Sequence, residues 1–257
     1  IIGAGISGLY IANLFKKNPK YQVSIFDKKN SLNLNEGYGV QLSVNSVKFL
    51  NDIGFSKLEK DEKFYPEKIN FYSKKDQDKI CELDISKFNL NDCKYTTLKR
   101  STLINFLKKD LNDLINTNYS VSKIDQGLEK IKLTFENKKT HECDYLIISD
   151  GVFSKSRNLV SNNQIQPKYN NTLAIRGIIP AKSNIIDKKN ILLFLGSDFH
   201  HVIYPISPSG DLNLIAIMKY KLSAEEQKNY SLLSDKSFSQ KILENIPQEN
   251  KEFFNNL

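Results

Sequence analysis

The sequence has few cysteines, and their spacing matches no common disulfide or metal-binding pattern. Its 257 residues include only three, at Cys81, Cys93 and Cys143. The number is odd and no pair has C-x-x-C spacing, so the sequence predicts neither a disulfide framework nor a zinc site, and no metal site is expected. This cysteine content fits an intracellular, reducing compartment best, and we expect a cytoplasmic protein.

Long apolar runs are missing as well. No uninterrupted run approaches the roughly 18 to 20 residues of a membrane-spanning helix, and no signal-peptide pattern precedes the first motif. With 40% hydrophobic and 11% aromatic residues, the composition indicates a soluble globular chain without a transmembrane segment. Its length allows one large domain or two of ordinary size.

Arginine is scarce although the formal net charge is +8. Of 37 basic residues only Arg100, Arg157 and Arg176 are arginine. The lysines are scattered among acidic residues without forming a stripe, which argues against a nucleic-acid partner. Because the chain otherwise uses lysine, we expect these three positions to require a guanidinium group. Its planar group can bind a phosphate or carboxylate with two hydrogen bonds, or stack on a ring. Chance retention is the alternative.

The first residues form a glycine-rich turn, Ile1-Ile2-Gly3-Ala4-Gly5-Ile6-Ser7-Gly8, which is the G-x-G-x-x-G pattern of dinucleotide-binding βαβ units. Gly3 allows the sharp turn, Gly5 lets backbone amides approach a pyrophosphate, and Gly8 lets a helix over 6–17 pack on the strand. The phosphates would lie at the positive N-terminus of that helix. The alternative is a glycine-rich turn without a ligand.

An acidic residue follows the next apolar run, at Asp27. It lies about 20 residues after the last glycine, where a ribose 2′-hydroxyl needs an acceptor. The strand before the glycines is shorter than the usual five or so residues, because only Ile1 and Ile2 precede Gly3, and there is no initiator Met. We therefore expect the sequence to be a piece of a longer protein.

Apolar periodicity predicts the remaining elements. Helices are expected over 44–53 and 101–115, and a hairpin from 69–72 and 80–83. Short strands are expected at 119–124, 131–135 and 144–148. Further strands, which predict an antiparallel sheet, are expected at 172–179, 191–195, 201–204 and 212–218. The tail over 223–257 has a polar, helical pattern.

The predicted strand at 144–148 leads into a second motif, formed by Asp150, Gly151, Ser154 and Arg157. A tight turn at the carboxyl end of a strand lines the ligand crevice of an open α/β sheet. With the opening turn, this segment resembles the flavoprotein aromatic hydroxylases of the para-hydroxybenzoate hydroxylase superfamily, whose second fingerprint is D-G-x-x-S-x-x-R after an apolar strand. The resemblance implies that these four residues serve FAD binding and the docking of NAD(P)H.

Two further segments resemble the same family. Arg100 begins an R-x-x-L-x-x-x-L helix, whose arginine contacts the flavin cofactor in that family. Gly39, Val40 and Gln41 resemble the start of the G-I-Q-L-x-P-N loop of the salicylate and 3-hydroxybenzoate hydroxylase branch. The family's third fingerprint, G-D-A-A-H followed by a helix, is absent from this sequence.

The resemblance also implies a histidine at the substrate ring, where a base could deprotonate a phenol. His201 is the expected residue, in a segment resembling the branch's H-x-V-x-Y-P sheet edge. The motif alone leaves open whether His200 or His201 faces the ring. In a regular strand Tyr204 would face opposite to His201.

The expected fold is α/β, a Rossmann-type FAD-binding domain with an interleaved, mainly antiparallel β-sheet substrate domain. The FAD-binding domain is expected over 1–68 and 95–165, the sheet domain over 69–94 and 166–222, and an incomplete helical part over 223–257. The implied activity is an FAD-dependent, NAD(P)H-using monooxygenase that hydroxylates a small aromatic, phenolic substrate with O2 through a flavin hydroperoxide. An NAD-dependent dehydrogenase and a non-catalytic nucleotide-binding module are the alternatives, and the sequence does not specify the substrate or the oligomeric state.

Overall fold

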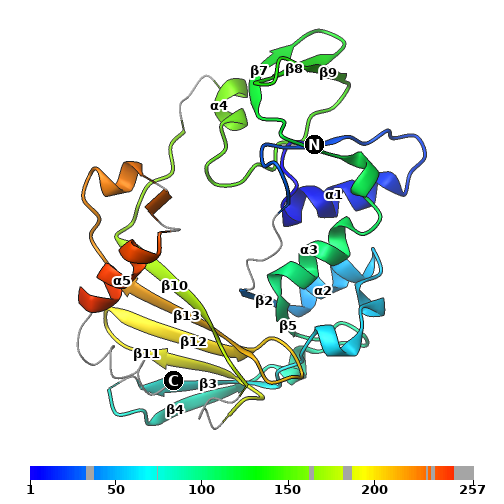
Figure 1. Ribbon diagram of the computed structural model, residues 1–257. Coiled ribbons are helices and arrows are strands. Elements are labelled where there is room, and N and C mark those ends of the chain that lie inside the picture. The colour runs from blue at the N-terminus through cyan, green and yellow to red at the C-terminus, as the bar shows by residue number, and fades with distance from the viewer. Residues whose placement is uncertain are drawn as a thin grey trace. The chain divides into compact units, whose positions relative to one another are not determined.

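The computed structural model describes residues 1–32, 38–73, 75–161, 165–181, 187–229, 231–232 and 235–245. Its contacts divide the chain into two compact units, each assembled from separate segments. Unit 1 comprises Ile1–Glu36, Asp52–Phe55 and Ser101–Lys168. Unit 2 comprises Gly37–Asn51, Ser56–Arg100 and Tyr169–Leu257. Compared with the expected domains, residues 37–51, 56–68 and 95–100 group with the large sheet, and residues 166–168 group with the dinucleotide motif. Figure 1 shows the elements of both units.

Unit 1 is built around short parallel strands. Strand β1 (Ile25–Asp27) pairs in parallel with β6 (Ile115–Thr117), and Ile2 forms parallel bridges to Phe26 and Ile148. Helix α1 (Ile6–Lys16) follows the Ile2 segment as predicted. A parallel arrangement whose first turn leads into a helix is the Rossmann-type unit expected from the sequence.

Two predicted elements of unit 1 differ from the structure. The helix expected over 101–115 is α3 (Arg100–Lys108), and after a 3-10 turn (Asn112–Leu114) the chain enters β6 at Ile115. Parallel pairing with β1 outweighs the helical spacing of the apolar residues there. The strand expected at 144–148 is wrong except for an isolated parallel bridge between Ile148 and Ile2, and the residues before it form β9 (Thr140–Cys143).

A three-stranded antiparallel sheet completes unit 1. It consists of β7 (Val121–Gln126), β8 (Ile131–Phe135) and β9. A buried cluster joins this sheet to the parallel strands through Ile2, Phe26, Val121, Ile124, Leu133 and Phe135. The last helix of the unit is α4 (Ser156–Val160). The cluster holds the first residues of the chain in place and so fixes the start of the glycine-rich turn.

Unit 2 contains a six-stranded sheet with the order β10-β13-β12-β11-β3-β4. Its strands are β3 (Lys68–Ser73), β4 (Lys79–Asp84), β10 (Thr172–Ile179), β11 (Ile191–Leu195), β12 (Phe199–Pro205) and β13 (Leu212–Lys219). All neighbouring pairs are antiparallel except β11 and β3. A separate antiparallel pair consists of β2 (Gly39–Leu42) and β5 (Thr96–Lys99), and α2 (Val44–Asn51) follows β2, ending before the predicted residue 53. The predicted mainly antiparallel sheet and its hairpin are confirmed.

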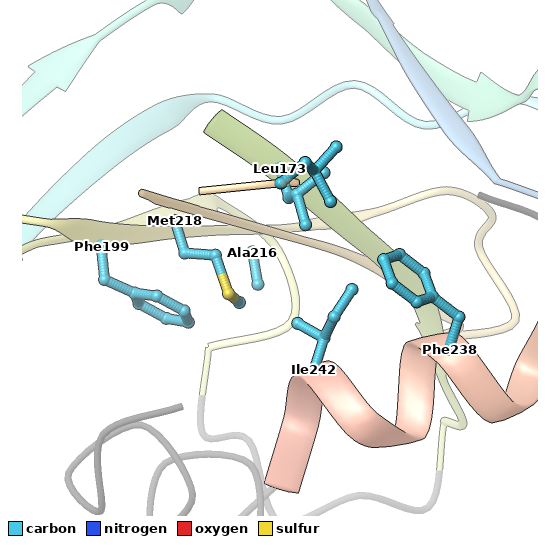
Figure 2. Close-up of a cluster of buried hydrophobic side chains, with 7 residues drawn as sticks. Leu173, Phe199, Ala216, Met218, Phe238 and Ile242 are labelled. Carbon is cyan, nitrogen blue, oxygen red and sulfur yellow. The ribbon is translucent and has the colours of Figure 1, made fainter. Parts of the chain in front are cut away.

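Helix α5 (Lys236–Asn245) covers one face of the six-stranded sheet. Figure 2 shows Phe238 and Ile242 of this helix beside Phe199, Ala216 and Met218 of the sheet. Burial of each large apolar side chain contributes about 1.5 to 3 kcal/mol, which is enough to hold a short helix on a sheet. The helical pattern predicted for the tail is confirmed for these residues. No helix in the described part of the chain is long and apolar enough to cross a bilayer.

Candidate functional site

The glycine-rich turn of unit 1 is packed against the second motif. Gly3 has φ +98°, and a Cβ added there would lie 2.5 Å from the backbone O of Ser149. A Cβ on Gly8 would lie 2.0 Å from the backbone O of Gly3. Neither position can hold a side chain without moving the backbone, so these glycines are required by the fold itself. The structure thus brings the first turn into contact with Ser149 and Asp150.

Gly5 differs from Gly3 and Gly8, because the space that a side chain would occupy at this position is empty. No heavy atom lies within 4 Å of a Cβ added at Gly5, and Gly5 is the N-cap of α1 without a side-chain cap. The N–H groups of the first turn of an α-helix have no partner within the helix, and they carry the positive end of its dipole. The open space at this 11-residue helix therefore fits a pyrophosphate group.

Asp27 is held beside this turn. Its Oδ2 accepts a hydrogen bond from the backbone N–H of Ala4 at 2.8 Å, and its Oδ1 accepts one from the N–H of Lys29 at 2.9 Å. The carboxylate therefore has a fixed orientation at the carboxyl end of β1, where a ribose hydroxyl would find a charged acceptor.

The second motif forms a compact turn of its own. Gly151 has φ +86°, Ser154 Oγ accepts from the N–H of Arg157 at 2.9 Å, and Arg157 Nη2 donates to the backbone O of Val152 at 3.2 Å. Two buried atoms, Asp150 Oδ1 and Arg157 Nε, have no hydrogen-bond partner within the described residues. Such buried atoms are rare in folded proteins, and a bound polar ligand is one way to satisfy them.

The other predicted flavin-contacting residues belong to unit 2. Gly39 N–H donates to Asn213 Oδ1 at 2.6 Å, and a Cβ on Gly39 would lie 2.8 Å from the ring of Tyr204. Val40 and Gln41 continue β2, and Arg100 begins α3, where its N–H donates to the backbone O of Tyr38 at 2.8 Å. Gly39 is therefore required by packing within unit 2, whatever it contacts in a ligand.

Gln41 belongs to a polar cluster that sequence reasoning missed. Tyr95 donates from its hydroxyl to Gln41 Oε1 at 2.7 Å. Tyr204 lies beside Gln41. Burial raises the pKa of Tyr204 to about 12. The charge of Arg176 and hydrogen bonds with Asn213 and Gln41 lower this pKa and so offset part of the effect. Asn213 could have been found from the sequence, because an amide within the apolar run of β13 is unusual in a buried strand.

The two adjacent histidines lie on opposite faces of β12. The pairing of β12 with β13 has no register shift, so side chains alternate along it. His201 is fully buried, 4.1 Å between ring centroids from Phe199, on the face that α5 covers. His200, half-buried, shares the other face with Val202 and Tyr204. His201 was expected at the substrate ring, although the motif alone did not decide between His200 and His201. In the structure, His200 lies on the same face as Tyr204, and His201 does not.

Comparison with known proteins agrees with this fold. A model of the NAD(P)-binding Rossmann-like domain matches residues 1–35. The chain is 23% identical over 235 residues to salicylate hydroxylase of Pseudomonas putida, covering 84% of this chain and 53% of the relative. It is 29% identical over 126 residues to the FAD-dependent monooxygenase pigN of Monascus ruber, covering 43% of this chain and 29% of the relative.

Solved structures with a similar fold include Klebsiella pneumoniae HpxO complexed with FAD and uric acid, with TM-score 0.77, 15% identity and coverage of 87% of this chain and 56% of that one. A salicylate hydroxylase substrate complex has TM-score 0.70 and 20% identity, covering 87% of this chain and 56% of that one. The resemblance to flavoprotein hydroxylases and the predicted fold class are confirmed. In each of these comparisons the chain spans less than two thirds of the relative's length.

Proposed function

We propose that this chain carries the FAD-binding unit and the substrate-side sheet of an FAD-dependent monooxygenase, which uses NAD(P)H and O2 to hydroxylate an aromatic, phenolic ring. One observation carries the proposal. The glycine-rich turn and the Asp150-Gly151 turn are in backbone contact, and the N-terminus of α1 beside them is open. A dehydrogenase that used only the first turn would not require the second.

The residues of unit 1 fit FAD as follows. The amides at the N-terminus of α1 would bind the pyrophosphate, and Asp27 would accept a hydrogen bond from the ribose. Asp150 Oδ1 and Arg157 Nε, which lack partners among the described residues, would bind polar groups of FAD or the docking NAD(P)H. When bound, FAD supplies the redox chemistry, which amino-acid side chains do not provide.

In unit 2 we assign the substrate-side base to His200. An imidazole within reach of a phenol can act as a general base and take its proton, which makes the ring carbon more nucleophilic. This assignment is supported by the shared face of His200, Val202 and Tyr204. Gly39, Val40, Gln41 and Arg100 remain the proposed flavin-contacting residues of this unit.

A second function, an NAD-dependent dehydrogenase, is favoured only by the family match to residues 1–35. That match covers the part of the fold that FAD and NAD(P) enzymes share. A non-catalytic nucleotide-binding module would share it too. Binding of FAD and turnover of O2 separate the three functions.

The test uses the full-length protein. We expect it to purify with flavin absorbance, or to take up FAD when reconstituted, and to oxidise NAD(P)H faster when a phenolic substrate is added, with one hydroxyl group gained by the ring. A protein that cannot be loaded with FAD would overturn the proposal. So would an FAD-loaded protein that reduces a ketone or oxidises an alcohol with NAD(P) and consumes no O2.

A further inference from the structure

His201 is buried among apolar side chains on one face of the six-stranded sheet. The residue is 0% exposed. Across the neighbouring strands it lies opposite Phe194 of β11 and Ala216 of β13. Along β12, side chains alternate between the two faces, so its neighbours on this face are Phe199 and Ile203, both of which are buried. Apolar residues thus occupy the four positions next to the imidazole in the sheet.

Helix α5 covers this face. Phe238 and Ile242, about one turn apart on the helix, belong to the same buried cluster as Phe199 and Ala216, and Figure 2 shows both side chains directed at the sheet. The helix has 10 residues, and a helix of this length is only marginally stable in water by itself. Its place therefore depends on the apolar surface beneath it.

A proton on His201 would bring a positive charge into this cluster. Both ring nitrogens are buried, and the transfer of a charged group from water into apolar surroundings is unfavourable. In an unfolded chain an imidazole takes up a proton below about pH 6.5. Departure of α5 from the sheet would let water reach the ring, so acid favours the uncovered state over the covered one.

The acidic groups that hold α5 stay ionised in the same pH range. Asp235, just before the helix, accepts a hydrogen bond from the backbone N–H of Ser237 at 2.8 Å, and hydrogen bonds with Ser237 lower the pKa of its carboxyl. Glu226 lies 3.7 Å from the Nζ of Lys241 in the helix, and a hydrogen bond from the backbone of Ser223 is the main cause that lowers its pKa. Mild acid therefore leaves these contacts in place.

The other ionisable groups around the cluster do not change charge in this range either. Tyr169 and Tyr220 pack against it; tyrosines ionise at alkaline pH, and burial raises the pKa of Tyr169 further. Lys236 and Lys241 of the helix remain protonated, and Glu244 is exposed. Within the described strands β11, β12 and β13, no charged residue lies on the covered face. The group whose titration acts on α5 is therefore His201.

We propose that His201 makes the cover of this sheet sensitive to acid, so that α5 leaves the sheet when the imidazole takes up a proton. The strands beneath the helix would stay paired, because backbone hydrogen bonds join β12 to β13 and β13 to β10 without a register shift. This inference goes beyond the proposed function and does not depend on FAD. The helix lies on the face opposite to His200 and Tyr204.

The test is hydrogen exchange of the full-length protein, followed by mass spectrometry between pH 5 and pH 8 and corrected for the intrinsic pH dependence of exchange. We expect the protection of the α5 amides to be constant above about pH 7 and to fall by up to about tenfold per pH unit below about pH 6.5. The amides of β12 and β13 should keep their protection over the whole range. These different responses would identify local opening of the helix.

His201→Phe should remove the pH dependence of α5, because the new ring fills the space without titrating. If phenylalanine is too large for the site, His201→Leu provides the same comparison with a smaller side chain. His200→Gln is the matched control, since it removes the adjacent imidazole from the other face, and its α5 protection should depend on pH as in the unmodified protein.

Three results would overturn the inference. The first is α5 protection that does not change with pH in the unmodified protein. The second is an unaltered pH dependence in His201→Phe and His201→Leu, which would assign the titration to another group. The third is an equal loss of protection in α5, β12 and β13, because the whole sheet would then be opening. None of these results bears on FAD binding or hydroxylation, which are measured separately.

Discussion

Asp27 and Ala4, 23 residues apart, are joined by a hydrogen bond of 2.8 Å from the backbone N–H of Ala4 to Asp27 Oδ2. The bond fixes the carboxylate beside the glycine-rich turn before any ligand arrives. Preorganisation of this kind lowers the cost of binding, because the group that meets the ligand loses little freedom.

Asp27→Ala should therefore weaken FAD binding. A hydrogen bond to a charged group is worth about 1.5 to 3 kcal/mol, so we expect the affinity of the apoprotein for FAD to fall about tenfold or more. Fluorescence titration with FAD measures it. Asp125→Ala is the control, since Asp125 lies in the same unit and pairs only with Lys123 among the described residues; equal affinity in both variants would contradict the role of Asp27.

Two glycines of one motif should respond in opposite ways to alanine. Gly5→Ala adds a Cβ where no atom lies within 4 Å, so the protein should fold with nearly unchanged stability and yet bind FAD weakly, because the methyl group occupies the space of the pyrophosphate. Gly8→Ala places a Cβ 2.0 Å from the backbone O of Gly3 and should impair folding itself. Thermal unfolding and FAD titration of both variants distinguish the two effects. If Gly5→Ala bound FAD normally, the phosphate would not lie at the N-terminus of α1.

Arg157→Lys should not be a conservative change. Lysine keeps the charge but cannot donate to Val152 and to a ligand from one planar group, so flavin retention or the rate of flavin reduction by NAD(P)H should fall. Stopped-flow reduction and flavin content measure the two effects. Lys155→Gln, which removes an exposed charge two residues away, should behave like the unmodified protein, and a lysine variant that did the same would show that position 157 requires only charge.

His200→Gln and His201→Gln should separate catalysis from packing. General-base assistance is worth about a hundredfold to ten-thousandfold in rate, so His200→Gln in the full-length enzyme should still oxidise NAD(P)H with substrate but release much more hydrogen peroxide per turnover. His201→Gln alters a ring packed on Phe199 and should mainly lower stability, by about 1 to 3 kcal/mol. Peroxide yield and urea unfolding are measured for both variants. Peroxide release by the His201 variant alone would return the base to His201.

Tyr204 should make the stability of the protein depend on alkaline pH. Burial raises its pKa from 10.0 to about 12 in the folded state, so between these values the unfolded chain releases a proton that the folded one keeps. The stabilisation is complete below pH 10 and is lost as the pH rises toward 12, by about 2 to 3 kcal/mol in all. Tyr204→Phe should lack this part of the loss, as urea unfolding at a series of pH values would detect. Parallel pH dependence of the two proteins would contradict the raised pKa.

The sequence predicted those parts of the fold that local patterns determine. In these parts, the periodicity of apolar residues or the spacing of glycines is compatible with one conformation only. They are the turn from Gly3 to Gly8, helix α1, the β3–β4 hairpin and the strands beyond Thr172. The helix predicted to reach residue 115 ends earlier. The helical spacing of apolar residues continues past Lys108, the last residue of α3, but Ile115 pairs in parallel with β1 instead. Pairing with a distant strand is not visible in a local window.

The candidate site was predictable to a similar extent. The dinucleotide motif named Asp27, and the resemblance to the second fingerprint of the hydroxylase family named Asp150, because the position of each residue in its pattern indicates its chemistry. The two histidines could not be distinguished, since adjacent residues of a strand face opposite sides and only the packing of α5 identifies the covered side. Tyr95 and Gln41 meet only because β2 and β5 pair, which no motif of either strand indicates.

The chain order of the two units has a consequence for synthesis. Each unit is assembled from segments that alternate along the chain, and β3 pairs in parallel with β11, Ile69 opposite Ile191. A ribosome adds about 5 to 20 residues per second, so β3 emerges roughly 10 s before the strand it needs. During that interval the hairpin it forms with β4 has no sheet to join, and an isolated hairpin is only marginally stable in water. A fragment ending before β10 would keep every strand of unit 1 but, of the six-stranded sheet, only the β3–β4 hairpin.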